Sequence, residues 1–319
     1  MNYDVFNGDA DGICALHQLR LAEPRQAILV SGVKRDIRLL EKLADNSEVN
    51  GAEITVLDIS MESNKDSLGT LLQRRNNIFY VDHHFAGEIP AADNLRATID
   101  PSPDVCTGIL IDRLIGGKFR LWAIVSAYGD NLHAAACATA AGLGLTDNEL
   151  GTLQELGELM NYNGYGRELA DLHITPGELF RAVAPFESPF DFYRESGVLG
   201  HLQKGYAEDM AKTRSARSFA ENDSGRIFAF PDASWSRRVA GVFSNEKARE
   251  MGEKAHALIV DNGDGTLMVS VRAPLINKQG AASLCCKFPT GGGREAAAGI
   301  NALPQEQLDA FIDAFRQTW

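Results

Sequence analysis

Ile78-Phe79-Tyr80-Val81-Asp82-His83-His84 carries the strongest structural signal in this sequence. Its four apolar residues predict a buried strand, and an aspartate and two histidines follow at the carboxyl end of that strand. Open α/β sheets bind their ligands at this edge. Carboxylates that cluster there repel one another and shift each other's protonation, so we expect a cation to compensate them.

Two other segments have the same layout. The apolar pair Val5-Phe6 leads into Asn7-Gly8-Asp9-Ala10-Asp11-Gly12, and the run Ile54-Thr55-Val56-Leu57 leads into Asp58. Parallel strands would bring all three tips to one edge of a sheet. Hard divalent cations such as Mn²⁺ and Mg²⁺ prefer carboxylate oxygens with an occasional imidazole. We therefore expect a site for two cations, with Mn²⁺ as the first choice and Mg²⁺ or Co²⁺ as substitutes.

The bulk composition is that of an ordinary globular protein. The chain has 319 residues, of which 45% are hydrophobic, and this length favours two domains. The five cysteines are odd in number and lack the spacing of a structural zinc site, so we expect buried thiols. The acidic start, Met1–Asp4, and the lack of a long apolar stretch favour a cytoplasmic protein that does not associate with membranes.

The formal net charge of -12 argues against one class of partner. Nearly all of the excess negative charge precedes Phe219. Proteins that bind long nucleic acids usually present a broad basic surface to replace condensed counterions, and this chain lacks one. A short nucleotide substrate, held by metals and a few arginines, fits the charge better. The sequence leaves open whether the chain forms a homodimer.

Short strand patterns alternate with helical patterns over the first hundred residues. This alternation predicts an α/β fold with a doubly wound, mostly parallel sheet. From Cys106 to about Ala184 the apolar spacing is helical, which predicts a helical cap. We place the first domain at residues 1–190, a connecting helix or linker at 191–218, and a smaller C-terminal α/β domain at 219–319. In the last of these, we expect a hairpin around Asn262–Gly265 and a Gly-rich loop at Gly291–Gly293.

A further acidic segment, Tyr128-Gly129-Asp130, follows the three strand tips. Taken in chain order, Asn7–Gly12, Leu57-Asp58, Asp82–His84 and this segment resemble the four motifs of the DHH phosphoesterase superfamily. The resemblance extends to the C-terminal DHH-associated domain, which binds substrate, and so covers nearly the whole chain. Size and domain plan are similar to the short subfamily of nanoRNases, pAp phosphatases and hydrolases of linear or cyclic dinucleotides. The matching segments are Asn7–Gly12, Leu57-Asp58, Asp82–His84 and Tyr128-Gly129-Asp130, followed by Val271-Arg272 and Gly291–Gly299.

The resemblance implies a role for each matching residue. Asp9 would bind one cation and Asp11 the other, Asp58 would bridge both, and His83 and Asp130 would complete the second site. His84 would face the phosphate, and Asp82 would orient an imidazole. Two such cations, about 3.5 to 4 Å apart, would activate a water molecule for in-line attack on phosphorus. The implied substrate-binding residues are His84, Arg272, Gly291, Gly292, Gly293 and Arg294.

Two positions depart from the family pattern. Asn7, a neutral and weaker ligand, stands where many relatives have a histidine or a further aspartate. Arg294 follows the triple glycine where a histidine is common, and its guanidinium could bind a phosphate through two hydrogen bonds or stack on a base.

Two of the matching segments also have a purely structural interpretation. The Asp130 segment has the composition of a helix-ending turn, and Gly291–Gly293 has that of a flexible turn.

These features together predict a Mn²⁺-dependent phosphodiesterase that hydrolyses short oligonucleotides to mononucleotides. Linear dinucleotides such as pGpG or pApA are the favoured substrates, with the catalytic roles assigned to Asp58, Asp82, His83 and His84. One alternative is a pAp-type nucleotide phosphatase or an exopolyphosphatase, since the same metals attack several phosphorus centres. A second alternative, motivated by Asn7, is a nucleotide sensor without catalysis.

Overall fold

The computed structural model describes residues 1–319 and divides them into two units, Met1–Lys204 and Gly205–Trp319. The division falls within helix α10 (Gly197–Thr213). The segment predicted to connect the domains, 191–218, contains this helix and the end of α9 (Pro189–Glu195). Each unit contains its own sheet, and the two units are described separately.

The sheet of the first unit has five strands, all parallel, in the order β2-β1-β3-β4-β5. Strand β1 lies between β2 and β3, so the chain changes direction across the sheet beside β1. This is the switch point at which open parallel sheets form their binding crevice. The strands are β1 (Asn2–Phe6), β2 (Ile28–Val30), β3 (Glu53–Leu57), β4 (Asn77–Asp82) and β5 (Leu95–Ile99).

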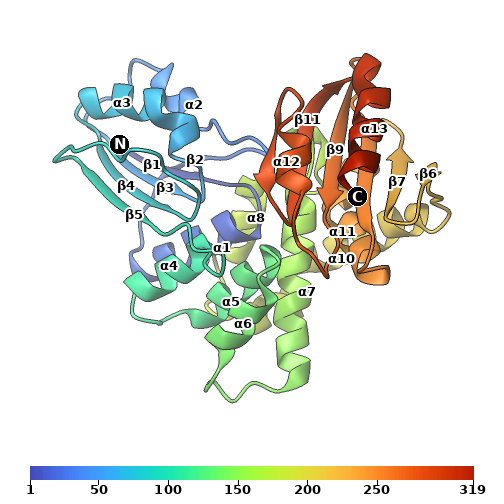
Figure 1. The fold of residues 1–319 in the computed structure, drawn as a ribbon. Helices are drawn as coiled ribbons and strands as arrows, with labels where there is room; N and C mark the ends of the chain where they lie inside the picture. Colours follow the sequence, from blue (N-terminus) through green and yellow to red (C-terminus); the bar gives the residue numbers. More distant parts are fainter. The chain divides into compact units, whose positions relative to one another are not determined.

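Helices cover both faces of this sheet, which confirms the doubly wound prediction (Figure 1). Alternate residues of the strands, such as Val5, Val56 and Tyr80, pack with residues of α2 (Glu41–Ala44) and α3 (Lys65–Gln73) in one apolar core. Helices α1 (Ala10–Ala22) and α4 (Thr107–Leu114) lie on the opposite face. The apolar spacing of Ile37–Leu43 predicts a helix over that range, but α2 begins only at Glu41 and ends at Ala44.

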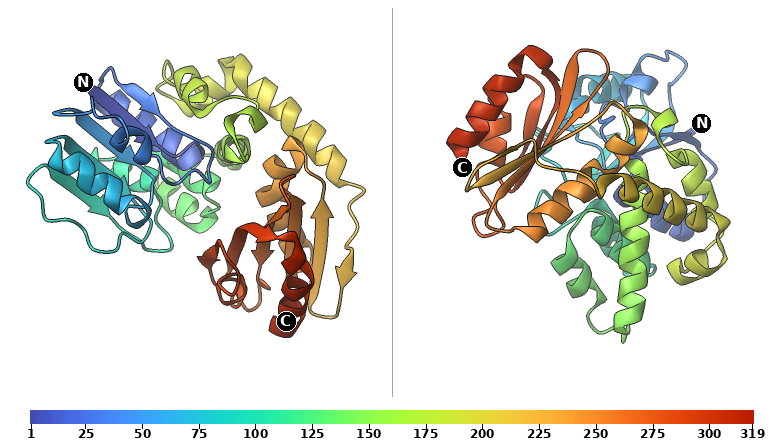
Figure 2. Two further views of the ribbon diagram at one scale, coloured as in Figure 1. Left: turned by 90° about the horizontal axis from the view of Figure 1, so that it is seen from above. Right: turned by 90° about the vertical axis from the view of Figure 1, so that its right-hand side faces the viewer.

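The predicted helical cap follows the sheet. Two of its helices start with a capping box. The hydroxyls of Thr146 and Thr175 accept from the amide of the glutamate three residues on, and the threonine amides donate to the carboxylate of that glutamate,. Figure 2 shows the long α7 beside the shorter helices. The helices are α5 (Arg120–Gly129), α6 (His133–Ala140), α7 (Asp147–Gly164), α8 (Pro176–Val183) and α9; short 3₁₀ turns occupy Glu62–Asn64 and Leu169–Asp171.

The second unit contains a six-stranded mixed sheet in the order β10-β11-β9-β8-β7-β6. Strands β7 and β8 are parallel, and the other pairs are antiparallel. The predicted hairpin is present between β8 and β9. The strands are β6 (Ala220–Glu221), β7 (Gly225–Phe230), β8 (Ala255–Asp261), β9 (Thr266–Arg272), β10 (Gly291–Arg294) and β11 (Ala297–Pro304).

Helices also cover both faces of this second sheet (Figure 2). Phe243 of α11 (Ser234–Glu250) packs on Phe228 of β7, with ring centroids 5.1 Å apart. Phe311 and Phe315 of α13 (Leu308–Thr318) join the apolar core on the other face, together with α12 (Ala281–Cys285). A 3₁₀ turn at Gln305–Gln307 precedes α13. No helix in either unit has the length and apolar character required to span a membrane.

The prediction of a Gly-rich loop at Gly291–Gly293 is wrong. These glycines begin edge strand β10, which pairs antiparallel with β11 so that Gly291 faces Ile300 and Arg294 faces Ala297. Gly293 has φ 136°, a value that side-chain-bearing residues rarely adopt. The pairing with β11 therefore overrides the low strand propensity of glycine, and no helix starts directly after the triplet.

Candidate metal centre

Backbone pairing places three predicted site residues side by side at the carboxyl edge of the first sheet. Phe6 pairs with Leu57, and Leu57 pairs with Val81, so the next residue of each strand falls in one row. The amide of Asn7 donates to Leu57 O at 3.2 Å, and that of Asp58 donates to Val81 O at 3.1 Å. The hydrophobic pattern that buries the strands therefore fixes the register of Asn7, Asp58 and Asp82.

The chain turns tightly after β1 and enters helix α1 at once. Asp9 is the N-cap of α1, and its Oδ1 accepts from the amides of Asp11 at 3.0 Å and Gly12 at 3.1 Å,. Gly12 has no room for a side chain, because a Cβ there would overlap Asn7 O. The turn thus holds Asp9 and Asp11 next to the strand tips. Both carboxylates are buried, with no more than 2% of either residue exposed.

Asp58 turns the chain sharply at the end of β3. Its φ is 59°, in the left-handed region that residues other than glycine, asparagine and aspartate seldom adopt,. Such backbone conformations are often found at functional sites, where the surrounding structure enforces them. The Asp58 carboxylate is buried and accepts a long hydrogen bond of 3.4 Å from Thr107 Oγ1.

His83 lies at the centre of the acidic cluster. Its Nε2 is 3.4 Å from Asp58 Oδ1, 3.6 Å from Asp130 Oδ2 and 3.8 Å from Asp11 Oδ2. On the other side of the ring, Nδ1 lies 2.9 Å from Val105 O and donates to it. This hydrogen bond leaves the lone pair of Nε2 directed at three carboxylate oxygens. The lone pair and the negatively charged oxygens repel one another. A cation held by Nε2 and the three oxygens would replace this repulsion with attraction.

The start of α4 holds Asp11 in place, a contact that the sequence does not reveal. The amides of Thr107 and Gly108 donate to its two oxygens at 2.8 and 2.7 Å, and Ser126 of α5 donates a further short hydrogen bond. The positive end of a helix dipole stabilises a carboxylate at this position. The side chain of Asp130, at the end of α5, is 17% exposed, and its Oδ2 lies 3.6 Å from His83 Nε2.

His84 is held by Asp82, the aspartate for which the resemblance implies an orienting role. Its Nδ1 donates to Asp82 Oδ1 at 2.7 Å, and its side chain is 40% exposed. Burial alone would lower the pKa of His84, but the hydrogen bond and the charges of Asp82 and the neighbouring carboxylates raise it above its usual value. The outer nitrogen, Nε2, is therefore able to donate to an anion.

The electrostatics of the cluster fit a divalent cation. Burial raises the pKa of Asp58 well above its usual value, and the charges of Asp11 and Asp9 raise it further. Burial also raises the pKa of Asp11, although His83 acts against this. Two sets of potential ligand atoms lie close enough to share an ion: Asp58, His83 and His84, and Asp11, His83 and Asp130. Oxygen ligands with one or two imidazoles suit Mn²⁺ or Mg²⁺.

Lys34 was not singled out in the sequence, but it lies within this centre. Its Nζ is 2.6 Å from Asp9 Oδ2 and 3.4 Å from Asp130 Oδ1. Burial would lower the pKa of Lys34, but Asp9 and the other surrounding groups raise it well above its usual value. The lysine follows β2 in a stretch that is typical of a loop, and only the parallel pairing of β2 with β1 brings it to the site.

Asn7 and Asp82 each have a buried oxygen without a hydrogen-bond partner, Oδ1 of Asn7 and Oδ2 of Asp82. The side-chain nitrogen of Asn7, Nδ2, donates to Lys34 O at 3.2 Å. A buried oxygen without a partner is unfavourable, so both atoms remain candidates for contacts with a bound cation or its water. The metal-ligand role of Asn7 stays a prediction.

The remaining predicted site residues belong to the second unit. Arg272 ends β9, where its guanidinium donates to Asn245 Oδ1 at 2.7 Å and Ser270 Oγ at 3.1 Å. Arg294 is exposed on the edge strand β10, together with Gly292 and Gly293. Their role in substrate binding stays a prediction.

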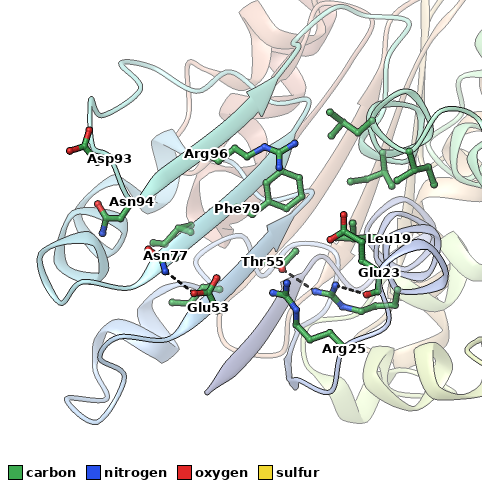
Figure 3. A pocket seen from close by; sticks show the side chains of 16 residues that line it. Leu19, Glu23, Arg25, Glu53, Thr55, Asn77, Phe79, Asp93, Asn94 and Arg96 are labelled. Atoms are coloured by element: carbon green, nitrogen blue, oxygen red, sulfur yellow. Dashed lines mark hydrogen bonds between the residues drawn. The ribbon is translucent and has the colours of Figure 1, made fainter.

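A hollow of about 360 Å³ opens at the other end of the first sheet. Glu53 and Asn77, at the amino ends of β3 and β4, contribute to its lining. Figure 3 shows the Arg96 guanidinium next to the Phe79 ring, 4.8 Å from the ring centroid. None of the acidic cluster lines this hollow, so it is separate from the metal centre.

No protein-family model and no curated protein matches this chain, whereas solved structures do. A DHH domain described as belonging to a family of ribosomal proteins aligns with a TM-score of 0.66 at 11% identity, over 99% of this chain and 85% of its own. The exonuclease RecJ bound to manganese aligns with a TM-score of 0.63 at 14% identity, over 99% and 89%. The pGpG-specific phosphodiesterase PggH from Vibrio cholerae aligns with a TM-score of 0.52 at 13% identity, over 100% and 99%. At these identities the similarity concerns the fold.

Proposed function

The chain has the fold of the DHH-domain proteins, and from this premise we propose that it is a metal-dependent phosphoesterase. The observation that carries the proposal is the placement of His83 Nε2 within 3.8 Å of carboxylate oxygens of Asp11, Asp58 and Asp130. Such a set of buried ligands is difficult to maintain without a cation. The neighbouring His84 and its partner Asp82 provide the second element, a histidine able to contact a phosphate.

Asp11, Asp58, His83 and Asp130 would hold the cation. When bound, a divalent cation supplies a Lewis acid that lowers the pKa of water and neutralises charge on a phosphate. The residues themselves contribute fixed geometry. The amides at the start of α4 orient Asp11, and Val105 O selects the His83 tautomer.

His84 would bind a phosphate oxygen through Nε2. Its raised pKa keeps more of the imidazole protonated, so it donates a charge-assisted hydrogen bond to an anion. The same proton is available to an oxygen that leaves phosphorus, which is the role of a general acid. Asp82, fully buried, orients this ring without contacting the substrate.

We further propose that the substrates are short 5′-phosphorylated oligonucleotides, with linear dinucleotides such as pGpG favoured. The net charge of -12 supports this, because a long nucleic acid would be repelled over most of its length,. The similarity in fold to a pGpG-specific phosphodiesterase agrees with it. Arg272 and Arg294 are the proposed nucleotide-binding residues of the second unit. Gly291–Gly293, which lack side chains, are proposed to let the substrate approach the backbone beside Arg294. Mn²⁺ is the proposed metal.

A substrate panel tests this proposal. The full chain, loaded with Mn²⁺, is incubated with pGpG, pApA, cyclic dinucleotides, pAp, longer RNA and polyphosphate, and the products are separated. Mononucleotides from the linear dinucleotides are expected. Release of inorganic phosphate from pAp or polyphosphate would instead support a phosphatase, and degradation of long RNA in preference to dinucleotides would contradict the proposed substrate class.

Variants show whether any hydrolysis comes from this centre or from a contaminating enzyme. Binding and cleavage by the wild type distinguish an enzyme from a sensor. Asp58→Ala and His83→Ala are expected to abolish hydrolysis. His201→Ala removes an exposed histidine of the first unit and should retain full activity. A wild type that binds dinucleotides without cleaving any of them would identify a nucleotide sensor and exclude the enzyme.

A further inference from the structure

The side chain of Lys34 enters the centre where the resemblance implies a cation. Its ammonium lies 2.6 Å from Asp9 Oδ2, 2.8 Å from Asn161 Oδ1 and 3.4 Å from Asp130 Oδ1. These partners come from three separate segments, namely the turn after β1, helix α7 and the end of α5. The ammonium is thus surrounded by oxygen atoms, as a bound metal ion would be.

Asp9 already has a cationic partner, which distinguishes it from Asp11 and Asp58. Its Oδ1 accepts two amide hydrogen bonds from the start of α1, and its Oδ2 pairs with Lys34. Accordingly, neither set of potential metal ligands includes Asp9. Among the carboxylates grouped around His83, Asp130 approaches Lys34 through Oδ1 at 3.4 Å and His83 through Oδ2 at 3.6 Å.

The lysine is fixed along its length. Its amide donates to Gly164 O at 2.8 Å, and its carbonyl accepts from Asn7 Nδ2 at 3.2 Å. The ammonium also lies 5.5 Å from the centroid of the Tyr165 ring, within the range of a cation–π interaction. Only 22% of the side chain is exposed. These contacts distinguish Lys34 from a surface lysine whose position is incidental.

We propose that the ammonium of Lys34 takes the place of one of the two cations that the sequence predicts, so that this centre binds a single divalent cation. That cation would lie among Asp11, Asp58, His83 and Asp130, and the inference therefore rests on the proposed metal-dependent function. The neutral Asn7 agrees with it, since a position served by an ammonium needs fewer carboxylates than one served by a divalent ion.

An ammonium in the place of a metal ion changes the chemistry that is available on this side of the centre. An ammonium is a compact charge with three donors, so Lys34 can bind a phosphate oxygen in place of its longest contact, 3.4 Å to Asp130 Oδ1, while it stays paired with Asp9. It does not act as a Lewis acid on water. Lys34 is therefore expected to bind and orient the phosphate, while water activation depends on the single cation.

Metal stoichiometry tests the proposal without reference to activity. The full chain is stripped with a chelator, reloaded with Mn²⁺, desalted and measured for bound manganese per chain. Electron paramagnetic resonance then distinguishes an isolated Mn²⁺ from a magnetically coupled pair held about 3.5 to 4 Å apart. The wild type is expected to bind one Mn²⁺ with the signal of an isolated ion.

Variants of Lys34 provide the second part of the test. Lys34→Ala frees Asp9 and is expected to raise the stoichiometry from one to two, with a coupled signal, whereas Lys34→Arg keeps the charge and should remain at one. Lys42→Ala removes a half-exposed lysine paired with Asp36 and should also remain at one. If Lys34→Ala does not fold, Lys34→Gln is measured in its place.

The outcomes distinguish this inference from the proposed function. Two coupled Mn²⁺ ions in the wild type, or a single ion in both the wild type and the folded Lys34 variant, would overturn the inference and leave the metal-dependent function intact. A wild type that retains no manganese and gains no stability from it would overturn the proposed function, and this inference with it.

Discussion

Nδ1 of His84 donates a hydrogen bond of 2.7 Å to Oδ1 of the fully buried Asp82. This contact decides which nitrogen of His84 faces outward. Asp82 is the last paired residue of β4, opposite Ile99 of β5, so the sheet itself holds the carboxylate in position. A rigid acceptor behind an outward-facing histidine is the arrangement that fixes a tautomer for proton transfer.

Asp82→Asn should therefore reduce turnover while leaving the fold unchanged. The amide is nearly isosteric, but it can present its NH₂ group to Nδ1 and favour the wrong tautomer of His84. Loss of such an orienting partner typically costs about 10- to 100-fold in activity. The loss should appear in kcat. An unchanged kcat in the folded variant would show that Asp82 does not orient His84.

Asp58→Asn should abolish hydrolysis and yet stabilise the metal-free protein. The pKa of Asp58 is raised, mainly by burial, so the folded state favours the protonated carboxyl. The contribution of this carboxyl to the stability of the metal-free wild type is thus greatest below its usual pKa of 3.8 and is lost as the pH rises through the higher folded value. Asparagine cannot ionise, and it tolerates the left-handed φ of this position.

Urea unfolding of both proteins at pH 7 measures this effect. The metal-free variant is expected to be more stable, because its folded state no longer contains a buried carboxyl that ionises at this pH. Added Mn²⁺ should stabilise the wild type much more than the variant. A variant that is less stable than the metal-free wild type would contradict the electrostatic account of the cluster.

His17 should make the protein sensitive to mild acid. Burial, with the ring edge-on against Trp122, lowers its pKa from 6.5 to about 4, although the hydrogen bond from Nε2 to Phe186 O, 2.8 Å long, acts in the opposite direction. The unfolded chain therefore binds a proton that the folded chain does not, and stability falls as the pH drops from about 6.5 towards 4. The slope from this one histidine is at most about 1.4 kcal/mol per pH unit.

His17→Gln should flatten the acid side of the stability profile. The glutamine keeps a donor near Phe186 O but does not titrate. His256, whose pKa burial also lowers to about 4, remains in the second unit and preserves part of the slope. The measurement is the free energy of unfolding in urea at pH 7, 6 and 5, with His201→Gln as the exposed control. Equal slopes in wild type and His17→Gln would refute the assignment.

Arg294→Ala should raise the KM for 5′-phosphorylated dinucleotides, with little change in bound manganese. The residue is exposed on the edge strand β10, so its removal should not disturb the core. Loss of a bidentate guanidinium–phosphate contact is worth about 1.5 to 3 kcal/mol, which corresponds to roughly 10- to 150-fold in KM. Arg316→Ala, an exposed arginine of α13, is the matched control. Unchanged relative rates across the substrate panel would remove Arg294 from the proposed site.

The strand tips were predictable because apolar runs end abruptly in ligand-type residues. A parallel sheet brings such ends to one edge whatever the details of packing, and Asp9, Asp11, Asp58 and His83 meet there as expected. Asp130 also lies in the cluster, although it follows a helix. Its placement depends on α5 packing against α1, which the sequence pattern alone does not specify.

The contacts that the sequence did not reveal join distant segments. Thr107 bonds Asp11, and Lys34 pairs with Asp9, because a helix start and a loop converge on the sheet edge. No local pattern marks either residue, since threonine and lysine are ordinary surface residues in such stretches. The strand at Gly291–Arg294 was missed for a related reason: its pairing with β11 is a tertiary effect that outweighs glycine's low strand propensity.

The most direct test is anomalous diffraction at the manganese edge from crystals of the full chain soaked in Mn²⁺. The account predicts a manganese peak within coordination distance of Asp58 and His83, bounded by Asp11 and Asp130. No peak at this position, with the four side chains still gathered as described, would contradict the assignment of the strand-tip cluster as a metal centre.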